Sequence, residues 1–173
     1  LSHYSLGWMP AWLSAAGVAA PVLNRALRSR LSGLAARAGG LDPRRTMPAF
    51  ATRRARRTHL RPLSPVDASS TVVLFVDSFT RAFRPQVATA VAEILRAADP
   101  VYRASDLVDR ASASVGCAAD NCCGLTWIST GQLDRARKVL RRTVADLDDG
   151  TDRPIVVVEP SCAAALAKDL PEL

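Results

Sequence analysis

The clearest pattern in the chain is a continuous apolar run at 72–76, Val-Val-Leu-Phe-Val, with no polar position inside it. Such a run predicts a strand that is buried on both faces, as in a parallel sheet. A similar run at 155–158 predicts another buried strand. Apolar residues at helical spacing predict helices between them, one from Pro85 until just before Asp99 and one after Gly131. Strands that alternate with helices indicate an α/β fold with a small parallel sheet.

The helix expected after residue 131 has one apolar face and one basic face. Its inward residues are expected to be Leu133, Ala136, Leu140, Val144 and Leu147. Its outward residues are expected to be Arg135, Arg137, Arg141 and Arg142. This division predicts an amphipathic helix that packs on the sheet.

The chain divides into three predicted parts. Residues 1–41 are expected to form a helical extension, because apolar residues recur there at helical spacing until the glycine pair at 39–40. Residues 42–70 are rich in Pro, Arg, Ser and Thr, a composition typical of a linker. Residues 71–173 form the predicted α/β domain.

An uncharged run at 6–23 nearly reaches the length of a membrane span. Pro10 and Pro21 interrupt this run, and Ala, Gly and Ser lower its hydrophobicity, so we interpret it as a packed or interfacial helix. No Lys or Arg precedes the run, and a secretory signal peptide is therefore not expected. We expect a cytoplasmic chain, with peripheral contact at the inner face of the cell membrane left open.

The net charge of +7 is distributed very unevenly along the chain. Residues 1–61 carry eleven arginines and one acidic residue, which gives +10, and the remainder carries −3. Only two of the 23 basic residues are lysines, which together with the abundant alanine indicates a GC-rich genome rather than selection for phosphate contacts. Nucleic acid is therefore not an expected partner.

The candidate chemistry lies in four cysteines, all in the acidic part of the chain. Adjacent Cys122 and Cys123 cannot easily form a disulfide with each other, so reduced thiols that act as ligands or redox groups are expected. Gly124 gives the backbone room to turn around the two sulfurs. A helix is expected to start beside them, which favours the thiolate form that binds metal.

Two further candidates follow the predicted strands directly. Asp77 follows the first strand and Cys162 follows the last, and the carboxyl ends of parallel strands meet at one edge of a sheet. We therefore expect Cys162 to approach the cysteine pair, and Cys117 to stand apart. The alternatives are cysteines that only fill space and an Asp77 that only caps a loop. Trp127 is expected to pack over the cysteine turn and to shield it from water.

Motifs in this half of the chain resemble those of one family. The tripeptide Cys-Cys-Gly at 122–124, with Asp-Arg-Ala-Arg at 134–137 and Glu-Pro-Ser-Cys at 159–162, is similar to the cysteine-rich CCG domain that also occurs in heterodisulfide reductase. The segment Phe-Val-Asp-Ser-Phe-Thr at 75–80 resembles the branch fused to flavin-binding dehydrogenases of the glycolate and D-lactate type. The resemblance covers about residues 71–173 and implies a carboxy-terminal fragment of such an enzyme.

In that family a flavin domain oxidises a 2-hydroxy acid, ferredoxin-like clusters carry electrons, and CCG repeats hold an iron–sulfur or related metal centre. The resemblance implies an electron-transfer role, with a 4Fe–4S cluster at Cys122, Cys123, Cys162 and Asp77. It also implies flavin and ferredoxin-like domains or subunits as partners. FAD is expected only in a missing domain or partner, and the chain is not expected to be active alone. The alternative is a non-catalytic interaction module, or a degenerate fragment, that docks on a partner subunit.

The chain also departs from the family pattern. Many members have a cysteine at the position of Asp77, and no second cysteine lies close behind Cys162. Iron–sulfur clusters usually have four protein ligands, so an incomplete or labile cluster, or zinc with mixed Cys and Asp ligands, stays open. The family has a short second strand before its CCG turn, whereas segment 99–121 has no comparable apolar run. We therefore expect an incomplete sheet.

Overall fold

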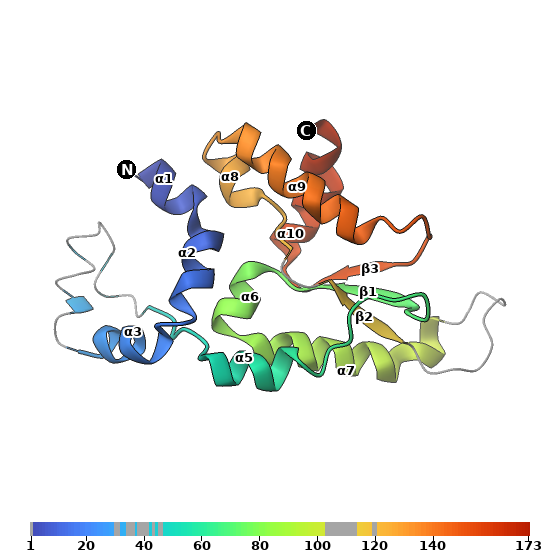
Figure 1. The fold of residues 1–173 in the computed structure, drawn as a ribbon, viewed down its shortest axis with the longest axis horizontal. Helices are drawn as coiled ribbons and strands as arrows, with labels where there is room; N and C mark the ends of the chain where they lie inside the picture. The colour runs from blue at the N-terminus through green and yellow to red at the C-terminus, as the bar shows by residue number, and fades with distance from the viewer. Residues whose placement is uncertain are drawn as a thin grey trace.

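Three parallel strands form one sheet between two layers of helices (Figure 1). The computed structural model of the chain describes residues 2–29, 32–33, 37, 42, 44, 47–102, 114–118 and 121–173. The strands are β1 (Val72–Phe75), β2 (Val115–Ala118) and β3 (Ile155–Val157), and their order in the sheet is β2-β1-β3. The predicted α/β fold with a small parallel sheet and preceding helices is confirmed.

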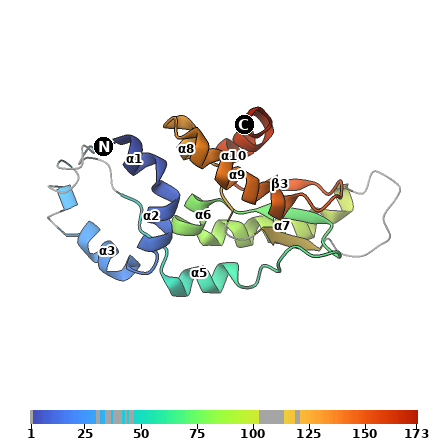
Figure 2. The ribbon, with the colours of Figure 1, turned by 45° about the horizontal axis from the view of Figure 1, so that its top comes forward.

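The helices lie in three groups around this sheet. The chain begins with α1 (Ser2–Gly7), α2 (Met9–Ala16) and α3 (Ala20–Leu27). One side of the sheet carries α5 (Arg53–Leu60) and α7 (Pro85–Tyr102), and α6 (Ser78–Phe83) joins β1 to α7 (Figures 1 and 2). The other side carries α8 (Leu125–Ser129), α9 (Leu133–Leu147) and α10 (Pro160–Ala164). A π-helical turn, Ala165–Asp169, and a 3-10 turn, Leu170–Glu172, end the chain.

The central strand β1 is buried along its whole length, as its apolar run predicts. Val72 pairs with Val115 of β2, and Val73 pairs with Ile155 of β3, so both edges of β1 are hydrogen-bonded. Side chains alternate between the two faces of a strand. One face contributes to an apolar cluster with α7, formed by Leu63, Val72, Leu74, Val76, Ala88, Ala92 and Val115. On the other face, Phe75 packs with Cys123, Cys162 and Ala165.

The strand β2 shows that the expectation of an incomplete sheet was wrong. Its sequence, Val-Gly-Cys-Ala, has too few large apolar residues to be recognised as a strand. Tertiary neighbours supply the pairing instead: the Cys117 N–H donates to the Ser64 carbonyl at 2.8 Å, and Pro65 forms a bridge with Cys117. Gly116 allows this close approach, because a Cβ there would lie 2.8 Å from Val66 Cα.

Two other elements differ from the sequence prediction, β3 in its burial and α7 in its last residue. The strand β3 was expected to be buried, but it lies at the edge of the sheet and Ile155 is 44% exposed. The helix α7 was expected to end before Asp99, but its backbone continues through Pro100 to Tyr102. The φ angle of proline is compatible with a helix, and its ring removes only one backbone donor, so a proline near the end of a helix does not fix the last residue.

Part of the segment 42–70 that composition predicts as a linker is folded onto the domain. The helix α5 begins after Thr52, whose hydroxyl accepts from the Ala55 N–H at 3.2 Å. It lies beside α7, where the Thr89 hydroxyl donates to the His59 carbonyl at 2.9 Å. Leu63 then enters the core cluster. The predicted glycine stop at 39–40 lies outside the described residues.

The buried face of α9 differs from its predicted apolar face by two positions. Ala136 and Leu140 are buried as expected. Leu133 is 40% exposed, whereas Thr143 is buried. The Thr143 hydroxyl donates to the Cys122 carbonyl at 2.9 Å, which satisfies a polar group inside the core. A polar residue therefore joins α9 to the cysteine turn.

Arg135 was expected to point outward from α9, and that expectation was wrong. Its guanidinium carbon lies 4.8 Å from the centre of a Trp8 ring and 5.9 Å from that of Trp127. The two indole rings meet edge to face, with centres 6.4 Å apart. Cations are attracted to the faces of aromatic rings. Together with a 3.0 Å hydrogen bond from the Thr126 hydroxyl to the Gly7 carbonyl, this contact fixes the first helices to α8 and α9.

Of the helices in the described part of the chain, none has the length and apolar content that a membrane crossing requires.

The stacking of Arg135 on Trp8 is expected to stabilise the attachment of the amino-terminal helices. In a double-mutant cycle with Trp8→Ala and Arg135→Ala, we expect a coupling free energy of about 1 kcal/mol, typical of a partly desolvated cation–π contact. Urea unfolding of the wild type, both single variants and the double variant measures it. Arg141 is exposed on the same helix, so a parallel cycle with Arg141→Ala should give no coupling. Equal coupling in both cycles would contradict the contact.

Candidate functional site

A cavity of about 440 Å³, the cysteine cavity, lies where β1 and β3 end. The loop after β1, the cysteine turn before α8 and the loop after β3 all contribute to it. Its polar and sulfur-bearing lining includes Asp77, Ser78, Cys122, Cys123, Glu159 and Cys162. Loops at the carboxyl edge of a parallel sheet commonly form ligand sites. The structure therefore brings together all four residues that the sequence singled out as candidate ligands: Asp77, Cys122, Cys123 and Cys162.

The three thiols of the cavity form a continuous chain of contacts. Cys123 Sγ lies 2.7 Å from Cys162 Sγ, although 39 residues separate them in the sequence. The Cys122 thiol is hydrogen-bonded to Cys123 and to Ser78. Cys123 and Cys162 are buried, and Cys122 is partly exposed. The expected approach of these three sulfurs is confirmed.

The thiols of the adjacent pair, Cys122 and Cys123, are protonated at neutral pH in the metal-free chain. Hydrogen bonding to Cys123, together with burial, raises the pKa of Cys122 far above its usual value. Hydrogen bonding with Cys122 lowers the pKa of Cys123, but its hydrogen bond with Cys162 and its burial outweigh this effect and raise that pKa to about 12. Backbone amides of Gly124 and Leu125 at the start of α8 favour the thiolates, as predicted. Desolvation and the neighbouring sulfurs outweigh these amides.

The turn that holds the two cysteines depends on Gly124. Its φ of +74° lies in the left-handed region, where a side chain is disfavoured. A Cβ at this position would also lie 3.3 Å from Leu140 Cγ of α9. The glycine therefore permits the backbone to reverse directly against the packed helix, as the sequence suggested.

The position of Asp77 is compatible with both roles considered for it, a cap and a metal ligand. One of its carboxylate oxygens, Oδ1, accepts from the N–H groups of Phe79 and Thr80 at 2.8 and 2.9 Å, and so caps α6. The other oxygen, Oδ2, is buried and has no hydrogen-bond partner among the described residues. A buried carboxylate oxygen without a partner is costly, and it is a suitable oxygen ligand for a cation in the same cavity.

Sequence reasoning missed Asn121, which precedes the cysteine pair. Its side chain is 2% exposed, and neither its amide oxygen nor its amide nitrogen has a hydrogen-bond partner within the described part of the chain. Asparagine is usually exposed, so the residue type does not predict that this side chain is buried. Its position directly before two cysteines was the only signal in the sequence. The carboxamide of Asn121 therefore has two N–H donors and one acceptor oxygen without partners directly before the cysteine pair in the sequence.

Two other sequence candidates lie outside the cysteine cavity. Cys117 belongs to β2 and lines a different cavity, as its expected separation from the other cysteines predicted. Trp127 is buried directly after the turn, but its ring contacts Trp8 and Arg135 and does not line the cysteine cavity. The expectation that Trp127 covers the site is therefore wrong, because α8 directs its ring toward the amino-terminal helices.

The comparison with known families identifies this region. Residues 104–167 match the CCG family, described as a cysteine-rich domain. The chain carries a CCG cysteine-rich domain. All four cysteines lie in the matched range, whereas Asp77 precedes it. Such domains are typical of iron–sulfur oxidoreductases such as heterodisulfide reductase, so the domain resemblance predicted from the sequence is confirmed. No curated protein and no solved structure matches this chain.

The donor types of the cysteine cavity fit a thiolate-bound metal centre. Three thiols and the partnerless Asp77 oxygen line one cavity, and thiolates are the usual ligands of zinc and of iron–sulfur clusters. As placed, no group of three or more His, Cys, Asp or Glu among the described residues is arranged to hold a metal ion. Two sulfurs on one tetrahedral zinc are about 3.8 Å apart for bonds of about 2.3 Å, whereas Cys123 and Cys162 are 2.7 Å apart. Binding therefore requires these two sulfurs to lose their protons and to separate by about 1 Å.

Replacement of Gly124 tests the constraint on the cysteine turn. We expect Gly124→Ala to lower the free energy of unfolding by about 2 kcal/mol, since it combines left-handed strain with a close contact to Leu140. Gly131 is the matched control, because its φ is +72° but nothing lies within 4 Å of an added Cβ. Urea unfolding of Gly131→Ala should show the strain alone, about 1 kcal/mol. Equal losses for both variants would mean that Leu140 does not restrict the turn.

The raised pKa values predict how the stability of the metal-free chain depends on pH. Above the unfolded-state pKa near 9 the unfolded chain loses its thiol protons, while folded Cys123 keeps its proton up to about pH 12. The folded state then binds more protons, so the free energy of unfolding should fall from pH 9 to 11 by about 1 kcal/mol per pH unit for each of the two retained thiol protons. Urea unfolding at each pH measures this slope. Cys123→Ser should have a shallower slope, and identical slopes would contradict the retained proton.

Proposed function

We propose that this chain is the electron-transfer, iron–sulfur portion of a flavin-dependent oxidoreductase that acts on 2-hydroxy acids such as glycolate or D-lactate. The observation that carries the proposal is the meeting of three thiols from two distant loops in one cavity of a CCG domain. If the thiols only filled space, nothing would require the loop with Cys162, the partnerless carboxylate oxygen of Asp77 and the left-handed Gly124 to lie at the same place. The arrangement supports a role in binding a redox-active metal centre.

In this proposal Cys122, Cys123 and Cys162 hold the centre, and Asp77 Oδ2 completes its ligand set. A thiolate-bound iron–sulfur cluster, when present, accepts and donates single electrons. The chain contributes the low-dielectric pocket formed by Phe75 and Ala165, which limits access of water to the sulfurs. Backbone amides of Gly124 and Leu125 favour the thiolate form once a cation replaces the thiol protons.

The link to a flavin enzyme rests on the segment 75–80 and on its position. This segment resembles the corresponding part of flavin-linked dehydrogenases, and in the fold it runs from the end of β1 into α6 beside the cysteines. Phe79 lines the cysteine cavity and is 41% exposed, which leaves an apolar surface at its mouth. A flavin or ferredoxin-like domain docked there would lie next to the metal centre. The flavin itself would belong to that partner.

One observation favours a second candidate function, a non-catalytic interaction module. Large apolar side chains remain exposed on the amino-terminal helices and the turn between α2 and α3, among them Tyr4, Trp12, Val18 and Val22. Exposed apolar side chains in one region are typical of protein contact surfaces. In this alternative the helices attach the chain to a partner subunit and the cysteines carry no metal. Purification without air distinguishes the two, because an iron–sulfur protein is brown and a docking module is colourless.

The decisive experiment is anaerobic reconstitution of the full chain with ferrous iron and sulfide. Air must be excluded, because neighbouring thiols that oxidise cannot bind iron. We expect Cys122→Ser, Cys123→Ser and Cys162→Ser each to lower bound iron at least tenfold and to reduce the visible absorption of the cluster. Cys117→Ser is the matched control and should retain the iron content of the parent. Iron analysis and absorption spectra provide the readouts.

Asp77→Asn separates the two roles of that residue, since an asparagine oxygen can still cap α6. We expect the metal-free variant to keep the thermal midpoint of the metal-free parent, and the reconstituted variant to bind less iron than the reconstituted parent. Equal loss at all four cysteines, or no iron in the parent chain, would refute the proposed metal centre.

A further inference from the structure

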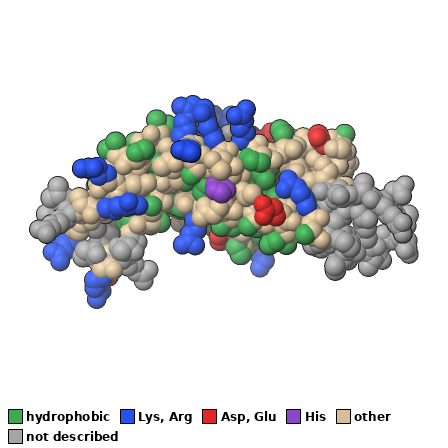
Figure 3. Space-filling model, turned by 90° about the horizontal axis from the view of Figure 1, so that it is seen from below, with side chains coloured by type: hydrophobic (Ala, Val, Ile, Leu, Met, Phe, Trp, Pro, Cys, Tyr) green, Lys and Arg blue, Asp and Glu red, His purple; other side chains and the backbone are tan. Residues whose placement is uncertain are grey.

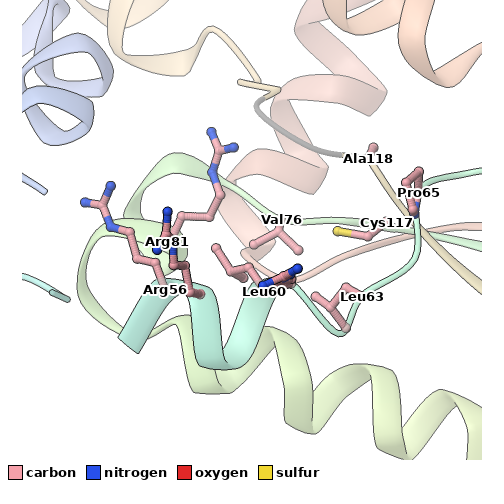
Figure 4. A pocket seen from close by; sticks show the side chains of 10 residues that line it. Arg56, Leu60, Leu63, Pro65, Val76, Arg81, Cys117 and Ala118 are labelled. Carbon is pink, nitrogen blue, oxygen red and sulfur yellow. The ribbon is translucent and has the colours of Figure 1, made fainter. Parts of the chain in front are cut away.

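A second cavity, of about 380 Å³, lies on the opposite face of the sheet from the cysteine cavity. It is formed where β1 and β2 end, and α5 covers it (Figure 4). Residues after α5, including Leu63 and Pro65, complete its wall. We call it the arginine cavity. Its volume is that of a site for a small molecule, and its position at the carboxyl edge of parallel strands is the usual one for ligands.

The arginine cavity has an apolar base and a basic rim. Leu60, Leu63 and Val76 supply apolar surface. The rim carries four arginines, namely Arg56, Arg57, Arg61 and Arg81. Among the described residues no Asp or Glu lines it. Figure 3 looks onto this side of the molecule and shows Lys and Arg side chains gathered on part of it, with few acidic side chains.

This arrangement of charge differs from an ordinary solvated basic face. Arg57 and Arg61 are one helical turn apart, a like-charge spacing that destabilises a helix. Arg56 and Arg81 come from different helices, are half-buried, and lie near each other above Leu60 (Figure 4). The Arg56 guanidinium donates to the Leu13 carbonyl at 3.2 Å, which holds it in position at the cavity. Arg56 and Arg81 are half-buried, whereas Arg57 and Arg61 are exposed, and all four line the cavity. An anion bound there would gain free energy from their combined positive charge.

We propose that the arginine cavity binds a small organic anion. Its phosphate or carboxylate oxygens accept hydrogen bonds from the guanidinium groups, whose planar forks match both kinds of oxyanion. Its apolar body packs on Leu60, Leu63 and Val76. Cys117 lies in the wall of the cavity, so a bound ligand covers its thiol. This proposal concerns the α5 side of the sheet and does not rest on the proposed function of the cysteine cavity.

Calorimetric titration of the metal-free chain with three probes tests the proposal. Phenyl phosphate carries both an oxyanion and an apolar ring, inorganic phosphate carries only the oxyanion, and benzyl alcohol carries only the ring. We expect phenyl phosphate to bind at least tenfold more tightly than either of the others, and its affinity to fall with added salt. Absence of phenyl phosphate binding, or equal affinity for inorganic phosphate, would overturn the proposal.

A matched pair of variants locates the binding. Arg57→Ala with Arg61→Ala removes two rim charges at exposed positions, where folding should be unaffected. Arg53→Ala with Arg54→Ala removes the same charge from α5 at exposed positions that do not line the cavity. We expect the first double variant to weaken phenyl phosphate binding at least tenfold and the second less than twofold. Equal losses would indicate general attraction by charge and would overturn the proposal.

Alkylation of Cys117 gives a readout that is independent of affinity. Saturating phenyl phosphate should slow its reaction with iodoacetamide at least fivefold, measured by peptide mass spectrometry in the Cys122→Ser, Cys123→Ser, Cys162→Ser variant. Unchanged reactivity of Cys117 would place the ligand elsewhere and refute the assignment. Vesicles of phosphatidylglycerol test a lipid source of the same phosphate chemistry: protection by vesicles without protection by phenyl phosphate would exclude a small soluble anion.

Discussion

The burial of β1 between two neighbouring strands and two helix layers determines where the chemistry of this chain lies. Because β1 is paired on both edges and covered on both faces, it can contain only apolar side chains. Polar groups begin directly after the strand. Val76 lines the arginine cavity on one face of the sheet, and Asp77 and Ser78 line the cysteine cavity on the other. The two cavities are therefore separated by the end of a single strand, and each takes its chemical character from the elements packed over its face.

In the metal-free chain, Cys122 and Cys123 of the thiol cluster are neutral groups. Burial beside Phe75 removes water from the sulfurs, and the hydrogen bonds among them favour protonated Cys122 and Cys123. The same surroundings leave Asp77 Oδ2 and the Asn121 amide without partners in the described structure. Such buried polar groups cost free energy in folding, and they are typical of positions at which a bound group later satisfies them. The cost and the proposed function therefore arise from the same residues.

The two cavities are neighbours in the fold. A smaller cavity of about 100 Å³ is lined by Arg56 and Arg81, which also line the arginine cavity, and by Pro10 and Ser78, which also line the cysteine cavity. The amino-terminal helices close this region, because Leu13 is buried against it. An anion held by the arginines would therefore lie close to the thiols across a short stretch of packed side chains. The arginines themselves are positively charged. Positive charge near a metal–thiolate centre, such as the one proposed in the cysteine cavity, favours the reduced and more negative form of that centre.

The sequence by itself determined the features that depend on local pattern, and only the tertiary structure decided those that depend on distant partners. The run at 72–76 and the glycine turn at Gly124 could be recognised because continuous apolar residues and left-handed turns leave few alternatives. Parallel strands end at one edge of a sheet, and this rule predicted from the sequence that Cys122, Cys123 and Cys162 meet in one cavity.

The strand β2, in contrast, is held by Pro65 and β1 rather than by its own weak propensity. The basic helix α5 and its cavity exist because a segment with the composition of a linker packs on α7. Arg135 turns inward because Trp8 and Trp127 offer ring faces from two other helices. Cys122 and Cys123 stay protonated because burial and sulfur neighbours outweigh nearby amides, and that balance depends on three-dimensional distances which no spacing in the sequence records.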